Sequence, residues 1–409
     1  MDALPDSIRA DYARDFDLAD EGFRNGRVAS TTDTKAKYWR EWQKYCEPLG
    51  VDPHLAKETT CFQTRARVLS GFAARTRRGA FGRGRQIGTG SVASALTAVG
   101  QAISLDTGIN PTKNEGSKQL IYPLQVMMTG FRKEDPATVK KLPIEVDIPE
   151  YLASFGRRRN SSARDRAIGD LTLIAFYFLL RIGEYTMKRH RNDSKQTVNF
   201  RVADITFFKK GEDGRLRQLP RNASKEEISA ADSATLRLTN QKNGWKGVCI
   251  NHHVNGDSYY CPVKALTRRF LHIRDHSEDA DIGIGAYFNN GTKYDVNDDD
   301  IRQALKFAGK ELNYPERGIP VDRIDTHSLR GGGANALSLA GYSDRAIQKM
   351  GRWRSATFLE YICDQLSAFS EGMSKSMSKV LNFVNIEGGV SHDVTSLAIN
   401  TAYTNAAAA

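Results

Sequence analysis

The strongest constraint on the fold is an apolar segment in the middle of the chain, between Arg164 and Leu180. Its apolar residues recur with the spacing of one helix face, which predicts a helix. Such a helix needs cover from other elements, so we expect it at the centre of a domain. The apolar positions are Ala167, Ile168, Leu171, Ile174, Ala175, Phe178 and Leu179.

Three short runs with strand character follow this helix along the chain. Asn243 and Gly244 lie between the second and the third run, and this dipeptide suits a tight hairpin turn. A small antiparallel sheet is therefore expected in a chain that is otherwise helical. The three runs are Val202–Phe208, Thr235–Thr239 and Gly247–His252.

Helices are expected again from Asp300 onward, with Leu305, Ala308 and Leu312 on one face. Three short helices should follow before residue 363. Glycines and serines mark their ends, because glycine favours a helix C-terminus and serine caps an N-terminus. These residues are Gly341, Ser343, Gly351 and Ser355. The predicted fold class is mainly α with a small antiparallel β-sheet (α+β).

A separate helical domain is expected upstream, over residues 31–134. One amphipathic helix should begin at Thr31, Thr32 or Thr34, and a second should be capped by Ser91. The first carries an aromatic stripe, interpreted as core rather than as a surface that stacks bases. The stripe consists of Tyr38, Trp39, Trp42 and Tyr45.

The remaining boundaries follow from composition. Residues 1–30 are expected to be a flexible segment, and 135–149 a linker, because Pro136, Pro143 and Pro149 oppose a helix there. A second domain should span residues 150–370, followed by a partly disordered tail over 371–409.

An arginine-rich stretch lies in the upstream domain. Between Cys61 and Leu105 there is no Asp, Glu or Lys. Arginines without counter-charges repel one another unless a polyanion neutralises them, so we interpret the stretch as a nucleic-acid contact. The alternative is a flexible basic loop without a ligand. The arginines are Arg65, Arg67, Arg75, Arg77, Arg78, Arg83 and Arg85.

Composition excludes several other classes of protein. The net charge of +11 permits a polyanionic partner, and no window offers the roughly 20 apolar residues of a membrane span. We expect neither a membrane partner nor secretion. The five cysteines form no Cys-x-x-Cys pair, which argues against a zinc site or a disulfide framework and fits a reducing compartment. They are Cys46, Cys61, Cys249, Cys261 and Cys363.

Three separated clusters carry residues suited to chemistry. Arg181 and Glu184 follow the central helix, where the pair could equally be a structural salt bridge. His327 and Arg330 are expected on one face of a helix, followed by three glycines that lower the stability of that helix. Alone, the two residues would be interpreted as an ordinary surface histidine and a solvated arginine. The third cluster is Gly351-Arg352-Trp353 with a tyrosine on the following helix. That residue, Tyr361, is one of 15 tyrosines.

Together these clusters resemble the catalytic domain of the tyrosine recombinase (phage-integrase-like) family. The resemblance covers about residues 147–365. The upstream helical region resembles that family's core-binding (SAM-like) domain. The motifs Leu-Arg-Ile-Gly-Glu-Tyr and Gly-Arg-Trp are most similar to those of integrases from eukaryotic mobile elements, such as Cryptons and DIRS-like elements. A protein of that subgroup would be expected in the nucleus. A protein from another source would be expected in the cytoplasm or nucleoid.

The resemblance implies roles for individual residues. Tyr361 would be the nucleophile, Arg181 and Arg330 would bind the phosphate, and His327 would be a general base or phosphate ligand. Glu184 would support the first arginine.

Two positions stay open. The family's hairpin lysine corresponds to Lys242 or to Lys246, and the stretch Lys209–Ala231 lengthens the path to that hairpin. The family places a His or Trp directly after the glycine, where this chain has Arg352, followed by Trp353. Alignment favours the arginine, and the indole N–H favours the tryptophan.

The implied reaction is cleavage of double-stranded DNA through a 3′-phosphotyrosyl bond, and rejoining, by a homotetramer on DNA. Two arginines would stabilise charge on the phosphate, so no metal, cofactor or ATP is expected. The alternatives are a type IB topoisomerase and a non-cutting DNA-binding protein that keeps the fold. A helix-turn-helix regulator would explain Ser343–Tyr361 but not Arg181.

Overall fold

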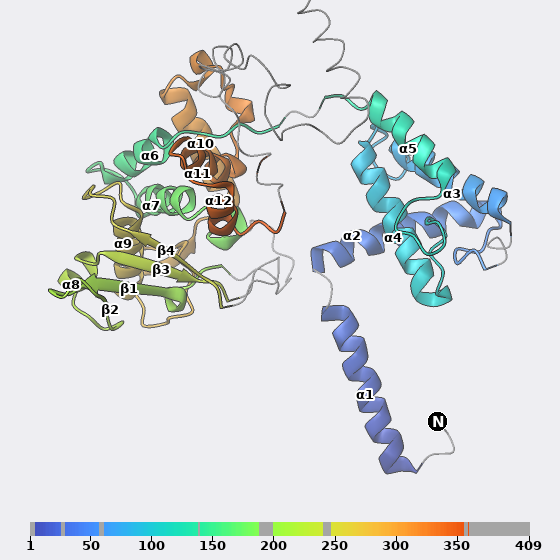
Figure 1. Ribbon diagram of the computed structural model, residues 1–409, viewed down its shortest axis with the longest axis horizontal. Helices are drawn as coiled ribbons and strands as arrows, with labels where there is room; N and C mark the ends of the chain where they lie inside the picture. Colours follow the sequence, from blue (N-terminus) through green and yellow to red (C-terminus); the bar gives the residue numbers. More distant parts are fainter. Residues whose placement is uncertain are drawn as a thin grey trace, which may run out of the picture. The chain divides into compact units, whose positions relative to one another are not determined.

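The structure is a computed structural model that describes residues 5–25, 29–56, 61–137, 140–187, 199–239, 247–355 and 359. The chain divides into two compact units, residues 1–333 and 334–409, each treated by itself below. The described part is mainly helical with two small antiparallel sheets, so the predicted fold class is confirmed (Figure 1). Within it, no helix has the length and apolar character needed to cross a membrane.

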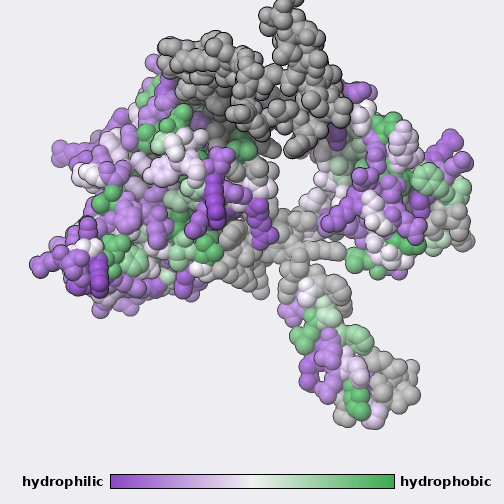
Figure 2. Space-filling view, viewed as in Figure 1, coloured by the Kyte–Doolittle hydropathy of each residue, from purple (hydrophilic) through white to green (hydrophobic). Residues whose placement is uncertain are grey.

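The upstream region is mainly helical in its described residues, with one isolated antiparallel bridge between Lys113 and Leu120. Its helices are α1 (Asp6–Asn25), α2 (Ala29–Cys46), α3 (Phe62–Arg77), α4 (Thr89–Thr107) and α5 (Tyr122–Glu134), with a 3₁₀ turn η1 (Glu47–Leu49). α1 lies in the stretch that was expected to be a flexible segment. Its apolar side chains Ile8, Tyr12 and Phe16 are exposed, and the surface of this helix mixes hydrophobic and hydrophilic residues (Figure 2).

Two predicted helix starts are wrong. α2 begins at Ala29, so the three threonines lie inside the helix rather than ahead of it. α4 begins at Thr89 behind Gly88, which leaves Ser91 in the first turn. Both helices therefore begin before the hydroxyl residues that were expected to cap them.

The aromatic stripe of α2 forms core, as predicted. Trp42 is fully buried, its ring meets Phe72 of α3 edge-on at 5.1 Å, and its Nε1 donates to the Pro53 carbonyl at 2.8 Å. Tyr45 is stacked on Trp42 at 5.9 Å. Edge-on and offset aromatic pairs add stability beyond the area they bury. The stripe is thus committed to packing.

The central helix is α7 (Ala163–Tyr177), which is buried along most of its length. It contacts α6 (Asp147–Arg157) and α9 (Pro262–Arg274). A Cβ at Gly169 would lie 2.7 Å from both the Cα of Ala153 and the carbonyl oxygen of Leu152, so glycine permits this approach of α6 and α7. The prediction of a buried central helix is confirmed, although it ends three residues earlier than expected.

The larger sheet has the strand order β2-β1-β3-β4, with every pair antiparallel. Its predicted hairpin is present: β3 pairs with β4, and Arg237 lies opposite Cys249. Asn243 and Gly244 lie outside the described residues. The strands are β1 (Ile205–Lys210), β2 (Leu216–Gln218), β3 (Ser233–Arg237) and β4 (Cys249–His253), and a second sheet pairs β5 (Ala286–Asn289) with β6 (Thr292–Asp295).

The helices after the second sheet match the prediction in position. They are α10 (Asp298–Glu311), α11 (Thr326–Leu339) and α12 (Asp344–Gly351); the short α8 (Lys225–Ser229) lies earlier, between β2 and β3. The Ser343 hydroxyl caps α12 by accepting a hydrogen bond from the Ala346 N–H at 3.4 Å. Gly341 has φ +82°, a left-handed conformation that suits the end of α11. The segment predicted to form the third short helix lies almost wholly outside the described residues.

Candidate active site

The first part of the site is the turn that ends α7. The N–H of Leu180 donates to the Ala175 carbonyl at 3.0 Å, and Leu179 has φ +49°. This is the geometry of a Schellman motif, which usually places glycine at the left-handed position. A leucine there is strained, typically by about 1–2 kcal/mol. The turn therefore holds an unfavourable backbone conformation directly ahead of Arg181.

Arg181 is fixed from behind by Glu184. The buried carboxylate accepts a hydrogen bond from the Arg181 backbone N–H at 3.0 Å and another from its Nη1 at 3.2 Å. The Arg181 side chain keeps 24% of its surface exposed, whereas the Glu184 side chain has none. Because Glu184 contacts the guanidinium of Arg181 through Nη1, the other N–H groups of the guanidinium can bind a ligand. The predicted contact between these two residues is present.

Arg330 reaches the same turn from α11. It is 2% exposed, and its Nη1 donates to the carbonyl oxygen of Leu179, two residues before Arg181. The two arginines that the sequence assigned to one phosphate are thus brought to one end of α7.

Two of the three glycines in α11 explain how this helix comes so close. A Cβ at Gly332 would overlap the carbonyl oxygen of Ile144, and a Cβ at Gly333 would overlap that of Phe176. Any side chain there would push α11 away from the end of α7. These positions therefore need glycine for close approach, which offsets its low helix propensity.

His327 lies in the first turn of α11, where part of its side chain reaches solvent and part is covered by the protein. Its pKa lies below the ordinary value because the surrounding protein removes water from the ring, and because the charges of Arg330 and Arg181 oppose a further positive charge. Asp325 acts in the opposite direction. Since charge repulsion falls with distance, His327 shares its surroundings with both arginines. The neutral imidazole is favoured at pH 7, and only that form accepts a proton.

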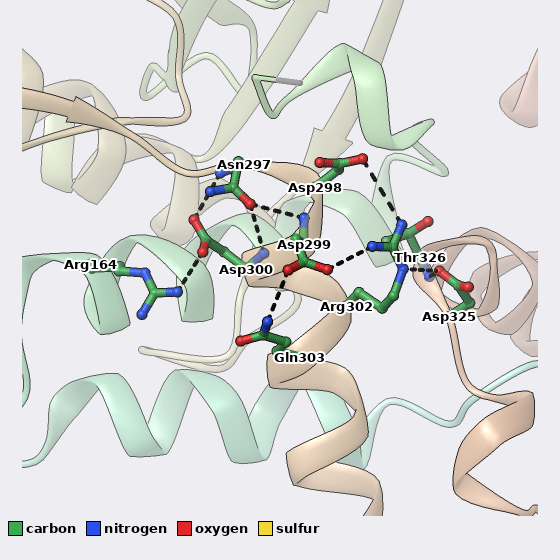
Figure 3. Close-up of polar contacts among 9 residues, drawn as sticks. All are labelled: Arg164, Asn297, Asp298, Asp299, Asp300, Arg302, Gln303, Asp325 and Thr326. Carbon is green, nitrogen blue, oxygen red and sulfur yellow. Dashed lines mark hydrogen bonds and ion pairs between the residues drawn. The ribbon is translucent and has the colours of Figure 1, made fainter. Parts of the chain in front are cut away.

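The start of α11 is held by Asp325, a residue that the sequence analysis left out of the site. Its Oδ1 accepts hydrogen bonds from the Thr326 N–H at 2.7 Å and from the Arg302 Nε at 3.2 Å (Figure 3). The Asp325 N–H donates to the Ser328 hydroxyl at 3.0 Å. Arg302 belongs to α10, 23 residues away, and nothing in its local sequence indicates this contact.

The segment before α6 also lies along the start of α11. The N–H of Leu142 donates to the Arg323 carbonyl at 3.0 Å, and that of Ile144 to the Ser328 carbonyl at 3.3 Å. These bonds flank His327 on both sides in the sequence. Part of the stretch that the sequence assigned to a linker is therefore packed against the helix that carries His327. The expectation that Pro149 opposes a helix is wrong, because Pro149 lies in the first turn of α6, where proline is tolerated.

The Gly-Arg-Trp cluster ends α12. Arg352 has φ +58° and is 2% exposed, and Trp353 is 8% exposed. A Cβ at Gly351 would overlap the indole ring of Trp353, so the glycine makes room for that ring. This accounts for the spacing of the cluster in terms of packing.

Three of the assigned residues lie outside the described residues: Lys242, Lys246 and Tyr361. In the described part of the chain, no group of three or more His, Cys, Asp or Glu side chains is arranged to hold a metal ion.

The arginine-rich stretch is largely helical, and its members separate into two groups. Arg77 is buried, and its guanidinium forms an ion pair with Asp135 and donates to the Ile87 carbonyl at 2.6 Å. The hydrogen bonds from Thr89 and then Arg77 lower the pKa of Asp135 to about 2. The expectation of arginines without counter-charges is therefore wrong for Arg77, whose partner lies 58 residues away.

The other arginines remain at the surface. Arg65 is half-buried over the ring of Phe62, at 5.5 Å, and the rest are exposed. On α3 and at its C-cap, the residues at 67, 75 and 78 lie opposite the buried positions 69, 72 and 76. The exposed group is Arg67, Arg75, Arg78, Arg83 and Arg85.

No protein-family model matches the sequence, and no curated protein matches it. The solved structures that are similar to this chain include an integrase and two recombinases. The Tn1549 transposon integrase in complex with circular intermediate DNA has 14% identity and a TM-score of 0.41, covering 82% of this chain and 98% of the other. XerA recombinase has 15% identity and a TM-score of 0.35, covering 84% and 98%. XerH site-specific recombinase, bound to its palindromic difH substrate, has 12% identity and a TM-score of 0.37, covering 77% and 72%.

Proposed function

We propose that the protein is a tyrosine recombinase or integrase that cleaves and rejoins double-stranded DNA through a 3′-phosphotyrosyl intermediate. The observation that carries the proposal is the arrangement around the end of α7. Arg330 bonds to the backbone beside Arg181, Glu184 holds Arg181 from behind, and both arginines act on His327. Two cations and a neutral base are the groups that an attack on a phosphodiester needs.

The proposed first step uses Tyr361 as the nucleophile. Its phenol oxygen attacks phosphorus while His327 accepts the phenol proton. The bond from phosphorus to the 5′-oxygen breaks, and that oxygen takes a proton from Lys242 or Lys246. Arg181 and Arg330 stabilise the charge that builds on the non-bridging oxygens. The reverse steps rejoin a strand, so the bond energy is conserved.

The domain organisation is part of the same proposal. Residues 31–134 would bind the duplex, residues 150–370 would cut it, and a homotetramer on DNA would exchange strands. Arg352 or Trp353 would add a further contact to the phosphate. The sequence motifs at residues 180–185 and 351–353 support membership of the eukaryotic mobile-element integrases. A protein of that subgroup would act in the nucleus.

Trapping the protein on DNA tests the nucleophile. The substrate is a library of nicked duplexes of randomised sequence, because a nick lets the cleaved fragment diffuse away and prevents rejoining. We expect a covalent adduct on a denaturing gel for the wild type and for Tyr342→Phe, which changes an exposed tyrosine, 58% accessible. Tyr361→Phe should form none. An adduct that persists in Tyr361→Phe contradicts the assignment, and DNA binding without any adduct supports a non-cutting protein.

The exposed face of α3 is the proposed duplex contact. Replacing Arg67, Arg75 and Arg78 with alanine should weaken DNA binding and reduce the salt dependence of affinity, by a slope of about 0.9 for each phosphate that the variant no longer neutralises. Arg14→Ala on the acidic α1 is the control, since Arg14 already pairs with Asp11 at 3.4 Å. An unchanged slope in the triple variant would remove α3 from the proposed interface.

A further inference from the structure

The charged cluster between α10 and the start of α11 lies next to the proposed site but outside its assigned residues. Figure 3 shows Arg302 reaching from α10 toward Asp325, while Arg164 meets the other end of the same cluster. Arg302 bonds to Asp299 through Nη1 at 2.9 Å and to Asp325 through Nε at 3.2 Å. Its side chain therefore joins two helices.

Arg302 is not needed to begin its own helix. Asn297 caps α10 by accepting hydrogen bonds from the N–H groups of Asp299 and Asp300, both at 3.0 Å. Asp300 completes the capping box by accepting from the Asn297 N–H at 2.9 Å. The bond from Arg302 to Asp325 is thus additional to a complete cap, and its effect falls on α11.

Asp325 is two residues from His327 and is turned toward the helix by its own bonds. One carboxylate oxygen, Oδ1, accepts from both Thr326 N–H and Arg302 Nε. Burial acts to raise the pKa of Asp325, but the Thr326 hydrogen bond and the charge of Arg302 outweigh it and hold the pKa below its ordinary value. The carboxylate therefore stays charged beside the imidazole at neutral pH.

We propose that Arg302 and Asp325 are positioning residues for His327: Arg302 holds and partly neutralises the Asp325 carboxylate at the start of α11, and the pair thereby controls when the imidazole accepts a proton. The inference rests on the proposed role of His327 as the base in DNA cleavage. Neither residue would touch the phosphate; each would act through the imidazole.

The charges that act on His327 come from several elements. Arg330 is on its own helix, Arg181 follows α7, and Asp325 precedes α11. Arg302 of α10 and Lys141 of the preceding segment act on Asp325 in turn. Of these groups, only Asp325 favours the protonated His327 ring. The pKa of His327 therefore depends on how far Arg302 neutralises the charge of Asp325.

This arrangement predicts opposite effects from two substitutions. Arg302→Gln removes a cation and leaves the carboxylate less neutralised, so the pKa of His327 should rise. Asp325→Asn removes the attraction while its amide oxygen still accepts the Thr326 hydrogen bond, so the pKa of His327 should fall further. A merely structural role would not give shifts of opposite sign.

The direct measurement is an NMR titration of the full-length protein with labelled histidines. The His327 ring signal is assigned as the one missing from His327→Asn. We expect the titration midpoint to move up in Arg302→Gln, to move down in Asp325→Asn and to stay near wild type in Arg302→Lys. Arg164→Gln is the matched control, because it breaks an ion pair to Asp300 of the same helix, 2.5 Å long, without touching Asp325.

Midpoints that move in the same direction, or an Arg302→Gln midpoint equal to that of Arg164→Gln, would overturn the proposal. Should Arg302→Gln fail to fold, Asp325→Asn still tests it, and an unmoved midpoint there counts against it. The pH dependence of adduct formation is measured in parallel, and its acid limb should follow the midpoints. If no variant forms an adduct while the midpoints still separate, the proposed function fails and the coupling of the three residues stands.

Discussion

Two buried tyrosines show how differently one side chain is used in this protein. The Tyr314 hydroxyl donates to Asp147 at 2.5 Å and accepts from the Glu145 N–H at 3.0 Å. The Tyr185 hydroxyl, which follows Glu184, is buried and has no hydrogen-bond partner among the described residues. Burial raises the pKa of both phenols. A buried polar group without a partner costs free energy, whereas one with two partners does not.

The tyrosine pair gives a prediction about stability. Tyr314→Phe should lower the free energy of unfolding by about 1–3 kcal/mol, because it leaves one oxygen of the Asp147 carboxylate and the Glu145 N–H without their partner. Tyr185→Phe should leave it unchanged or raise it by up to about 1 kcal/mol. Denaturant unfolding of the two variants measures the difference, and a larger loss in Tyr185→Phe would contradict it.

The glycines of α11 give a second prediction at this scale. Gly333→Ala should destabilise the protein by about 1–3 kcal/mol, because the added methyl overlaps the Phe176 carbonyl and forces α11 outward. Gly130→Ala is the control, since nothing lies within 4 Å of that position on α5. The control should be neutral or stabilising by up to about 1 kcal/mol. Thermal unfolding distinguishes the two, and equal midpoints would contradict the close approach.

At the scale of elements, β4 supports the end of α7 through His252. Its Nε2 donates to the Tyr177 carbonyl at 2.8 Å, and its ring meets Phe178 edge-on at 4.5 Å. Burial lowers the pKa of His252 to about 4. The neutral ring is therefore the form that completes the C-terminus of α7, just ahead of Arg181.

This contact makes stability depend on pH in a defined direction. The folded protein holds His252 neutral down to about pH 4, whereas the unfolded chain protonates it near its ordinary pKa of about 6.5. Its contribution is therefore complete above that value and declines as the pH falls toward 4, by about 3 kcal/mol at most. Unfolding measured at several pH values should show a shallower decline in His252→Gln than in the wild type. Parallel curves would contradict the assignment.

The arginines of α3 are expected to have two roles, one in stability on its buried face and one in DNA binding on its exposed face. Arg77→Ala should lower the thermal unfolding midpoint, because the Ile87 carbonyl and one oxygen of the Asp135 carboxylate lose their partner. Arg67→Ala, on the outer face, should weaken DNA binding and leave the midpoint unchanged, because Arg67 is exposed. Calorimetry and a binding titration on the same samples check both, and a midpoint that falls equally in the two variants would contradict the division.

At the scale of the whole molecule, duplex binding and strand cleavage should be separable. Arg181→Lys keeps a charge but loses the planar fork that addresses a phosphate. It should abolish adduct formation while duplex affinity stays within about twofold, since most phosphate contacts would lie elsewhere. Parallel loss of affinity and cleavage would place Arg181 in general DNA binding instead.

Periodicity was sufficient for the main elements of the fold. The central helix, the β3–β4 pairing and the positions of α10 to α12 were predicted because each depends on local apolar spacing or on turn residues. The end of α7 was misplaced, since Leu179 adopts a left-handed conformation that its sequence does not signal. The starts of α2 and α4 were misplaced because hydroxyl residues are compatible with a first helical turn.

The candidate site was predictable where a residue type was expected and not where a contact was. Arg181, Glu184, His327 and Arg330 were proposed from their order in the chain, and the structure brings Glu184 and Arg330 to the backbone next to Arg181 or to its side chain. Arg302, which holds Asp325, was missed because the contact depends on the packing of α10 against α11. Arg77 was assigned to the wrong group for the same reason, since Asp135 is near it only in the fold.

The left-handed turn at Leu179 also sets a limit on the length of α7. Had the helix continued, the Leu179 carbonyl would point along the axis toward the N–H four residues ahead. It accepts from Arg330 instead, an acceptor that exists only because the helix stops there. One more turn of helix, though locally favourable, would remove the anchor of Arg330 and carry Arg181 around to another side. The position at which α7 ends is thus itself a requirement of the proposed site.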